Sequence, residues 1–562
     1  MKISQIMGAY SAQKIQRVNS NSYVSRPNLV NKADFVSFSG QYVEKPVNVD
    51  LETAKFVANS LSTSTSGHRA VYGSDKFNKD IVELLTVGVA KYAKDQAKGQ
   101  DRNPVVMIGG DTRQATRESL PLIKEVLLGQ NVDVLYIEKP VPTPLLALAA
   151  REHDVDLAIL MTASHNPWAD GGYNLVTKNG AIAPAEVTQE VAKKVVETAQ
   201  KGSYTANKAA TPAVVKFFPY EMYKNELDAN KLINWDKIQN ANIDVYYDAL
   251  NGTGENVLPD LLNDYGIAST NVKSTGHEGP NPVAKNFGEL SANVKDSQAA
   301  LKIGLATDGD ADRFGVVDEN GEFMPANDVL LLAAYHLAKN KGLDGAIIRS
   351  QATSSQLDAV GQKYGQPIYE TPVGFKYIAE DIMDLRKEGK DTLVSGEESG
   401  GMTVNGHIPE KDGILADLLI LDLVATEGKP ISRILKDVKD ELGISQVAEV
   451  RSKRLNSEAD KDIIMNRVKD MFEDVIDGEM TEFAGFEIDA DRTMKHSESM
   501  LRYRKGGDGF KFFFTDGSNI LIRKSGTEPL VKNYVEAYGK DLTEAAEKRE
   551  KLKAEVDKIF TI

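Results

Sequence analysis

Short apolar runs alternate with longer amphipathic stretches along most of the chain. In the first part, apolar runs predict strands at 105–108, 132–137 and 157–161, and helical spacing predicts helices at 117–128 and 144–151. Strands separated by helices of this length indicate βαβ units, and therefore a largely parallel sheet. In such a sheet, ligands bind beyond the carboxyl ends of the strands.

The same alternation recurs twice farther along the chain. Its predicted strands are 243–247, 303–306, 314–317, 346–349, 368–370 and 392–394, and its predicted helices are 257–265, 329–341, 354–364, 375–386 and 413–425. The last stretch differs, since helices at 459–474 and 542–559 flank two alternating strands at 509–515 and 519–523. That order is typical of a smaller α+β domain.

These patterns predict an α/β protein of three tandem mixed-sheet α/β domains followed by a smaller α+β domain, arranged around a central cleft. Residues 1–42, which lack periodicity, are predicted to be a disordered extension. The predicted domains cover 43–213, 214–322, 323–438 and 439–562. A chain of 562 residues is expected to hold several domains of ordinary size.

Composition narrows the class of protein. The chain is 41% hydrophobic and 27% charged, and no apolar run approaches the ~20 residues that cross a bilayer, so we expect no membrane insertion. A net charge of −15 without a basic block argues against nucleic acid as a partner. The absence of cysteine, and of a secretory leader in the first residues, favours the cytoplasm.

Four loops carry candidate chemistry. The first is Thr-Ala-Ser-His-Asn-Pro at 162–167, which follows the predicted strand 157–161 and displays Ser164 where a substrate would bind. The Gly-x-Ser-x-Gly elbow of hydrolases is absent. On its own, the hexapeptide is also typical of a simple turn.

The second loop carries three carboxylates at alternate positions, Asp308, Asp310 and Asp312, which can converge on Mg²⁺ or Ca²⁺. An EF-hand would need glycine where Arg313 stands and helices where strands are predicted, although Glu319 matches its twelfth position. A Mg²⁺ site that leaves room for a phosphoryl oxygen is therefore favoured over an EF-hand. A solvated acidic turn is the alternative.

The third loop, Gly-Glu-Glu-Ser-Gly-Gly at 396–401, combines accessible backbone with carboxylates and suits a polyol such as a sugar. The fourth, Arg-Lys-Ser-Gly-Thr-Glu-Pro at 523–529, gathers cations, hydroxyls and glycine-freed amides into a cradle for an anion. Each alone is also explained as an ordinary flexible or charged loop. Together with the serine and the cation site, they indicate phosphoryl transfer on a sugar phosphate.

The four loops together resemble those of the α-D-phosphohexomutase superfamily, which comprises the phosphoglucomutases, the phosphomannomutases and their relatives. They occur in the family's order, one in each predicted domain. Shorter matches extend the resemblance over about residues 45–562, at 66–69, 110–113, 142–144, 251–254 and 371–376.

The resemblance implies that Ser164 carries a phosphoryl group, and that Mg²⁺ is held by Ser164, Asp308, Asp310 and Asp312. It implies catalytic roles for four further side chains: His165, Arg69, Lys376 and His407. It also implies that residues of several loops hold the substrate: Glu397, Ser399, Thr371, Gly374, Arg313, Arg523, Ser525, Gly526 and Thr527.

The implied reaction is reversible transfer of a phosphoryl group between C1 and C6 of a hexose phosphate, through a hexose 1,6-bisphosphate that is both intermediate and activator. The implied partners are small hexose phosphates, and the expected state is a monomer or dimer. Glucose phosphates are favoured because Gly-Glu-Glu-Ser-Gly and the run 407–413 resemble the phosphoglucomutase branch. The alternatives are a phosphomannomutase, a hydrolase of sugar phosphates, and a non-catalytic sugar phosphate binding protein.

The chain departs from the family pattern where a proton carrier is expected. Many relatives have Asn-Gly-x-Lys after the serine loop, whereas this chain has Gly-Gly-Tyr-Asn and places Asn174 at the lysine position. An amide is no general acid or base at neutral pH, which leaves Lys376, His407 and Lys178 as alternatives. Smaller departures occur in the other motifs: Lys524 for proline, Gly401 for histidine and Ala70 for glycine.

Overall fold

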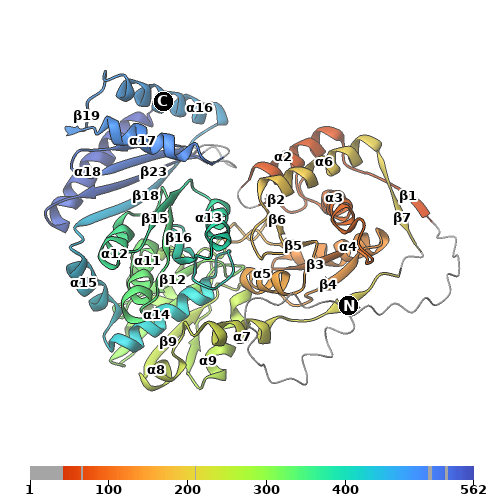
Figure 1. Cartoon of the computed structure of the whole chain (residues 1–562), viewed down its shortest axis with the longest axis horizontal. Helices are drawn as coiled ribbons and strands as arrows, with labels where there is room; N and C mark the ends of the chain where they lie inside the picture. Colours follow the sequence, from red (N-terminus) through yellow and green to blue (C-terminus); the bar gives the residue numbers. More distant parts are fainter. Residues whose placement is uncertain (1–41, 65–66, 209–210, 504–508, 526–529, 562) are drawn as a thin grey trace.

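The computed structural model describes residues 42–64, 67–208, 211–503, 509–525 and 530–561. In these ranges the chain forms three α/β units and a fourth unit built on an antiparallel sheet (Figure 1). This order confirms the predicted fold class. The predicted extension lies outside the described residues except for Tyr42, where strand β1 begins.

The first unit is built on a six-stranded mixed sheet in the order β2-β6-β5-β3-β4-β8. Strands β5, β3, β4 and β8 are parallel, while β6 runs antiparallel to β5 and β2. The strands are β2 (His68–Val71), β3 (Val105–Gly110), β4 (Asp133–Tyr136), β5 (Leu157–Met161), β6 (Asp170–Val176) and β8 (Val214–Lys216), and β1 (Tyr42–Pro46) pairs separately with β7 (Ser203–Asn207). Because β8 pairs with β4, the first sheet extends past the predicted boundary at residue 213.

Helices cover both faces of this sheet. Along β3, Val106 and Ile108 lie in one core with α2, α3, α4 and α6, whereas Met107 lies in another with α5 and α7, as the alternation of side chains in a strand requires. The helices are α2 (Leu51–Thr63), α3 (Lys79–Ala97), α4 (Gln114–Gly129), α5 (Thr143–Glu152), α6 (Ala185–Lys201) and α7 (Tyr220–Asn230). Because β3 and β5 are parallel, their carboxyl ends lie at the same edge of the sheet.

The second unit carries a five-stranded sheet in the order β10-β9-β11-β12-β13, in which only β10, β9 and β11 are parallel. The turn between β11 and β12 is the acidic loop 308–313. The elements are β9 (Ile243–Asp248), β10 (Ser269–Asn271), β11 (Leu301–Thr307), β12 (Phe314–Val317), β13 (Phe323–Met324), α8 (Trp235–Asn240), η1 (Thr253–Asn256), α9 (Leu258–Asp264), η2 (Ala284–Asn286) and α10 (Gly288–Asp296).

The third unit has a four-stranded sheet in the order β15-β14-β16-β17. Its elements are α11 (Ala326–Tyr335), β14 (Ala346–Ser350), α12 (Gln356–Tyr364), β15 (Ile368–Thr371), α13 (Phe375–Lys387), β16 (Thr392–Glu397), β17 (Gly401–Val404), α14 (Gly413–Glu427) and α15 (Ile431–Leu442). Helix α14 is buried along most of its length and packs against β11 and β12 as well as β17, so the second and third units share one core.

The predicted helix at 329–341 is α-helical only as far as α11 and continues as the π-helical turn η3 (His336–Asn340). The N–H of Lys341 donates to the carbonyl of His336, five residues back, at 3.0 Å. Asp422 on α14 lies 3.1 Å from Nε2 of His336 and also pairs with Lys341. These two contacts favour the wider turn, and a helical pattern in the sequence does not reveal them.

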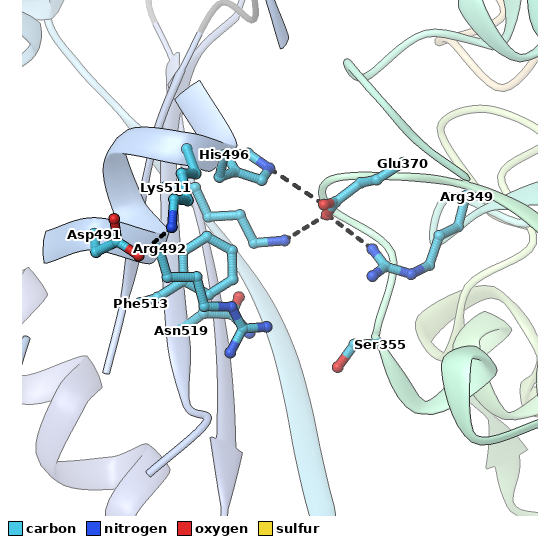
Figure 2. A pocket seen from close by; sticks show the side chains of 10 residues that line it. Arg349, Ser355, Glu370, Asp491, Arg492, His496, Lys511, Phe513 and Asn519 are labelled. Atoms are coloured by element: carbon cyan, nitrogen blue, oxygen red, sulfur yellow. Dashed lines mark hydrogen bonds and ion pairs between the residues drawn. The ribbon is translucent and has the colours of Figure 1, made fainter. Parts of the chain in front are cut away.

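The fourth unit is an antiparallel sheet in the order β18-β23-β22-β21 with helices packed on it. The elements are β18 (Gln446–Arg454), α16 (Glu458–Ile476), β19 (Glu482–Phe483), β20 (Phe486–Glu487), α17 (Ala490–Met500), β21 (Gly509–Phe513), β22 (Asn519–Lys524), β23 (Leu530–Tyr538) and α18 (Leu542–Ile559). It meets the third unit where Glu370 accepts hydrogen bonds from Lys511 and Arg349 (Figure 2). None of the helices in the described ranges has the length and apolar character that a membrane span needs.

Candidate active site

Ser164 lies directly beyond the carboxyl end of β5, where it faces the second unit. Its Oγ donates a hydrogen bond to Oδ2 of Asp308 at 2.8 Å and lies 3.2 Å from Nδ1 of His165. The backbone of Ser164 has a φ of +51°, in the left-handed region that residues other than glycine seldom adopt. Strain of this kind gathers at functional sites, because only the surrounding structure can maintain it.

A buried arginine, Arg113, maintains the shape of the serine loop. Its guanidinium donates to the carbonyls of Ser164 at 2.6 Å, of Asn166 at 2.7 Å, and of Pro167. Asp111 holds the guanidinium from the other side at 3.0 Å. Five planar donors suit this task, since they satisfy several carbonyls of one tight turn at once. The sequence signal for this role was the short family match at 110–113.

Asn174 holds the same loop from the neighbouring strand β6. Its side-chain amide donates to the carbonyl of Thr162 at 2.8 Å, and it is buried. The adjacent Gly172 allows this close packing, because a Cβ there would lie 1.9 Å from the carbonyl oxygen of Thr162. Asn174 is thus committed to the backbone of the loop and takes a positioning role.

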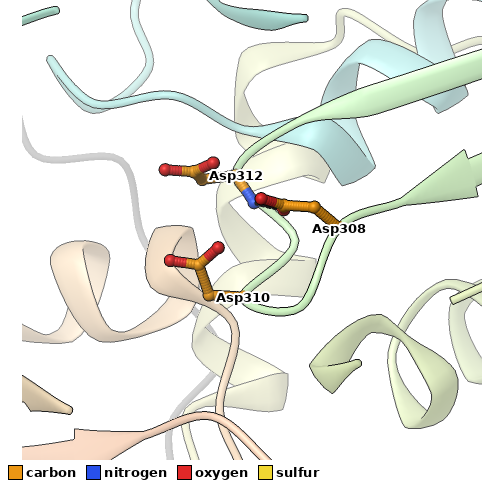
Figure 3. A group of neighbouring side chains, drawn as sticks. All are labelled: Asp308, Asp310 and Asp312. Atoms are coloured by element: carbon orange, nitrogen blue, oxygen red, sulfur yellow. Dashed lines mark hydrogen bonds between the residues drawn. The ribbon is translucent and has the colours of Figure 1, made fainter. Parts of the chain in front are cut away.

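Asp308, Asp310 and Asp312 converge as predicted. Figure 3 shows their carboxylates on one side of the turn after β11, and one oxygen of each lies within 4.8 Å of the others. Thr143 of the first unit donates to Oδ2 of Asp310 at 2.9 Å, so the turn is held against α5. The Oδ1 atoms of Asp310 and Asp312 are buried and make no hydrogen bond among the described residues. Buried carboxylate oxygens without partners are ligands that suit Mg²⁺.

The proximity of the three buried carboxylates disfavours the ionisation of Asp308 and Asp310, whereas Lys411 and Arg313 outweigh burial and lower the pKa of Asp312. Burial raises the pKa of Asp308 well above its usual value, and Asp310 and Asp312 raise it further. Burial and Asp312 likewise raise the pKa of Asp310 to about 6. A divalent cation among the three would reverse these shifts, because an adjacent positive charge favours the ionised form. The triad therefore has the electrostatic character of a cation site.

Lys411 is a cation beside the triad that the sequence reasoning did not single out. Its Nζ contacts Oδ2 of Asp312 and lies 3.7 Å from Oε1 of Glu410. Burial opposes the charge of this lysine, but Asp312 and Glu410 hold its pKa above the usual lysine value. The only sequence signal for Lys411 was its place in the run 407–413, which was compared with relatives for substrate preference alone.

Two arginines predicted to face the phosphoserine do lie around the serine loop. Arg69 donates to the carbonyl of Ala163 at 3.2 Å, and Nε of Arg313 lies 3.9 Å from Oδ1 of Asp312. Burial, with Arg313 and Arg69 nearby, lowers the pKa of His165 well below its usual value. His165 is therefore a neutral imidazole in cationic surroundings, which favour an anion next to Ser164.

The predicted sugar loop adjoins the acidic turn. The N–H of Phe314, directly after that turn, donates to the carbonyl of Gly400 at 2.9 Å. Glu397 ends β16, and its Oε1 accepts the N–H of Gly374 at 2.8 Å. Burial and the neighbouring Glu398 raise the pKa of Glu397 to about 7. Thr371, at the end of β15, is buried beside this loop, and Ser399 is half-buried within it.

The predicted phosphate cradle begins at the end of β22. Arg523 is half-buried there. Two residues later, the N–H of Ser525 donates a hydrogen bond to the carbonyl of Leu530 at 2.8 Å. Gly526 and Thr527 lie outside the described residues. Lys532 on β23 lies opposite Arg523 on the neighbouring strand β22. Burial lowers the pKa of Lys532, although the nearby Glu398 acts to raise it. Lys532 thus adds a cation between the cradle and the sugar loop, and the sequence reasoning missed it.

The structure corrects the assignment of His407 as a proton carrier. Its side chain is fully buried, and its Nε2 lies 2.8 Å from Oδ2 of Asp412, which also accepts the hydroxyl of Tyr223 at 2.7 Å. An imidazole enclosed in this network has no access to a substrate. Lys376, the second residue of α13, is only half-buried, and Lys178 is exposed in the turn after β6.

A strained serine hydrogen-bonded to a buried carboxylate triad, with arginines around both, is the arrangement of a metal-assisted phosphoryl-transfer site. Models of the four phosphoglucomutase/phosphomannomutase domains match the chain in order: domain I at 60–202, domain II at 221–321, domain III at 325–441 and the C-terminal domain at 487–553. The chain belongs to this family, the α-D-phosphohexomutases, and is a phosphohexomutase.

Individual relatives carry different substrate names. A phosphoglucomutase/phosphomannomutase of Thermococcus kodakarensis is 28% identical over 459 residues, covering 81% of this chain and 90% of that protein. A phosphoglucosamine mutase of Nitratidesulfovibrio vulgaris is 27% identical over 362 residues, covering 62% and 76%. The crystal structure of the open form of parafusin, a Paramecium phosphoglucomutase, has a TM-score of 0.73 at 22% identity and covers 92% and 97%, and shows the shared fold.

Proposed function

We propose that the chain interconverts glucose 1-phosphate and glucose 6-phosphate through a phosphoserine at Ser164. The observation that carries this proposal is the 2.8 Å hydrogen bond from Ser164 Oγ to Asp308. It joins a nucleophile of the first unit to the acidic turn of the second, which no single unit provides. A serine oxygen beside a cation site is where a phosphoryl group would be both attached and neutralised.

Asp308, Asp310 and Asp312, together with the phosphorylated Ser164, would hold Mg²⁺. When bound, the cation supplies positive charge at the phosphoryl oxygens as the group is transferred. Two buried carboxylate oxygens that accept no hydrogen bond from the part of the chain that the structure describes support this assignment. The same residues would be poorly suited to a softer metal, since they offer oxygen alone.

Each half of the reaction moves one phosphoryl group between oxygens. The bond from phosphorus to Ser164 Oγ breaks as a bond to a sugar hydroxyl forms, and the hydroxyl proton leaves to a base. In the second half, the other phosphoryl group returns to Ser164 and the sugar oxygen regains a proton. Arg69 and Arg313 would balance the charge at Ser164, while Arg523 would hold the phosphate that does not react.

Of the proposed proton carriers, Lys376 is favoured by position. It follows Gly374, whose N–H binds Glu397, so the helix that bears Lys376 is anchored to the proposed sugar loop. Glu397 and Ser399 would bind the sugar hydroxyls there. Replacing Lys376 by glutamine should reduce turnover strongly with little change in substrate affinity, whereas a loss of affinity alone would show that the lysine only binds.

A substrate panel tests the reaction and its specificity together. The purified protein with Mg²⁺ and a trace of glucose 1,6-bisphosphate should convert glucose 1-phosphate to glucose 6-phosphate, and mannose 1-phosphate more slowly. Faster conversion of the mannose or glucosamine phosphate would move the proposal to that substrate. Release of free phosphate without isomerised sugar would establish a hydrolase instead, and binding without turnover would establish a sugar phosphate binding protein.

A further inference from the structure

The third and fourth units form an open pocket of about 370 Å³, and none of its described lining residues belongs to the four family loops. Its walls come from β14 and β15 on one side and from α17, β21 and β22 on the other. Small-molecule sites in proteins start at about 300 Å³, so the cavity is large enough for a ligand. Figure 2 shows its charged side chains facing one another across the joint between the units.

Cations outnumber carboxylates in this cavity. Four cationic side chains line it, against two carboxylates, those of Glu370 and Asp491; the cations are Arg349, Arg492, Lys495 and Lys511. The whole chain has a net charge of −15, so a local excess of positive charge runs against the average. Cationic clusters in a concave surface concentrate anions even when the protein is acidic overall.

Glu370 is already paired with two of these cations, Lys511 and Arg349, which lie deeper in the pocket than the cations on α17. Its Oε1 accepts from Lys511 at 2.7 Å and from Arg349 at 2.8 Å. Although burial opposes ionisation, these two cations hold the pKa of Glu370 well below its usual value. Asp358 also accepts from Arg349, at 2.7 and 2.8 Å, so two carboxylates balance Arg349 and Lys511. The excess positive charge of the pocket therefore comes from Arg492 and Lys495, which face Asp491 alone among the lining carboxylates.

The two outer cations, Arg492 and Lys495 on α17, form weaker interactions than Arg349 and Lys511. Arg492 lies over the ring of Phe513 at 4.2 Å, and its guanidinium has no ion pair or hydrogen bond within the described ranges. Lys495 pairs with Asp491, but both side chains are 66% exposed, and such pairs contribute little. The ring of His496 packs on Phe513 at 5.2 Å, and its Nε2 lies 3.3 Å from Oε2 of Glu370.

We propose that this cavity binds a small phosphorylated anion, with Arg492 as its principal donor and Lys495 and His496 in support. A guanidinium stacked on an aromatic ring keeps its planar set of donors in one orientation, and that set matches two phosphate oxygens. The volume beyond a single phosphate accommodates an organic part. A bound anion would link α17 to the third unit and hold the fourth unit in place. This site is separate from the proposed mutase chemistry and does not depend on it.

Calorimetry with pyrophosphate as the probe, in metal-free buffer, tests the proposal on the full chain. An Arg523→Ala background weakens binding in the phosphate cradle, so that the remaining binding reports the cavity. Adding Arg492→Ala and Lys495→Ala should weaken that binding at least tenfold. The matched control is Lys469→Ala on α16, where the lysine forms a similarly exposed i,i+4 pair with Glu473 at 3.0 Å; it should leave binding unchanged.

Two results would overturn the proposal. One is pyrophosphate affinity that is the same with and without Arg492 and Lys495. The other is citrate bound as tightly as pyrophosphate, since the site would then recognise negative charge rather than a phosphoryl group. All of these variants change exposed or half-buried side chains, and their melting temperatures should stay close to that of the parent. Neither result bears on sugar phosphate turnover, so the mutase proposal stands or fails separately.

Discussion

Two clusters of charge lie at boundaries between units, and they differ in the groups at their centre. Between the first and second units, three buried carboxylates converge beside Ser164, with Lys411 and two arginines around them. Between the third and fourth units, four cations meet two carboxylates. The first cluster is suited to a cation that receives a phosphoryl group, and the second to an anion. In both, a ligand would connect two units, so binding and the placement of the units are coupled.

Removing the nucleophile should have the largest effect, and it acts on the first cluster alone. Ser164→Ala leaves no oxygen to carry the phosphoryl group, so conversion of glucose 1-phosphate should fall by a factor on the order of 10³ or more. The melting temperature should change little. Ser62→Ala on α2 is the matched control and should keep full activity. Retention of more than a tenth of the activity in Ser164→Ala would remove the phosphoserine from the mechanism.

Breaking the second cluster should instead cost stability. Glu370→Gln leaves Lys511 without its carboxylate, while Arg349 keeps Asp358; removing one partner of a buried pair costs about 3 kcal/mol. Urea unfolding followed by fluorescence should show an earlier transition, while Glu498→Gln on the exposed side of α17 should not. An unchanged transition would mean that these ion pairs contribute little to the stability of the contact between the third and fourth units.

The acidic cluster should make stability depend on pH when metal is absent. The pKa of Asp310 is raised to about 6 from 3.8, so the folded state holds a proton that the unfolded state has lost. Stability from this group is therefore lost as pH rises from about 4 to 6, by an amount on the order of 2 to 3 kcal/mol.

Thermal unfolding in chelator at several pH values, compared with Asp310→Asn, isolates this contribution. The wild-type chain should lose stability relative to the variant as pH rises through that window, and Mg²⁺ should abolish the loss. A wild-type chain that instead gains stability relative to the variant, in chelator, would contradict the repulsion inferred for the triad.

The smallest effect is expected at Asn174. Asn174→Ala removes a hydrogen bond to Thr162 and should cost about 1 kcal/mol of stability. Because the amide only positions the loop, activity should fall less than tenfold. A collapse of activity in a variant of normal stability would show that Asn174 takes part in the chemistry.

Sequence patterns predicted the parts of the fold in which one short segment contains the whole signal. The buried strands β5 and β11, and the acidic turn after β11, are contiguous runs of apolar or carboxylate residues, and they were predicted at or near their observed positions. Helices α2, α3 and α6 were not predicted. Their buried residues do recur at helical spacing, as at Val191, Ala192 and Val195 of α6, so this signal was present in the sequence. The helices pack against one another and on the sheet.

The missed and mistaken site residues have a common cause. Lys411 and Lys532 act through side chains that reach loops distant in sequence, so no local motif reveals their contacts. The family match at 110–113 includes Arg113 but does not show that its side chain holds the serine loop. His407 failed for the converse reason, since its position in a family-like run gives no sign of the buried partner Asp412. The proposed anion-binding pocket between the third and fourth units has no sequence signature either, because five elements of two units contribute residues to it.

The central claim is that Ser164 carries the phosphoryl group. Its direct test is peptide mass spectrometry of the protein after incubation with glucose 1,6-bisphosphate and Mg²⁺, and again after addition of excess glucose 6-phosphate. We predict one phosphoryl group on the peptide that contains Ser164, diminished by the second incubation as it passes to the sugar. A protein that converts glucose 1-phosphate while this peptide stays unmodified, or carries the group on another residue, would contradict the account.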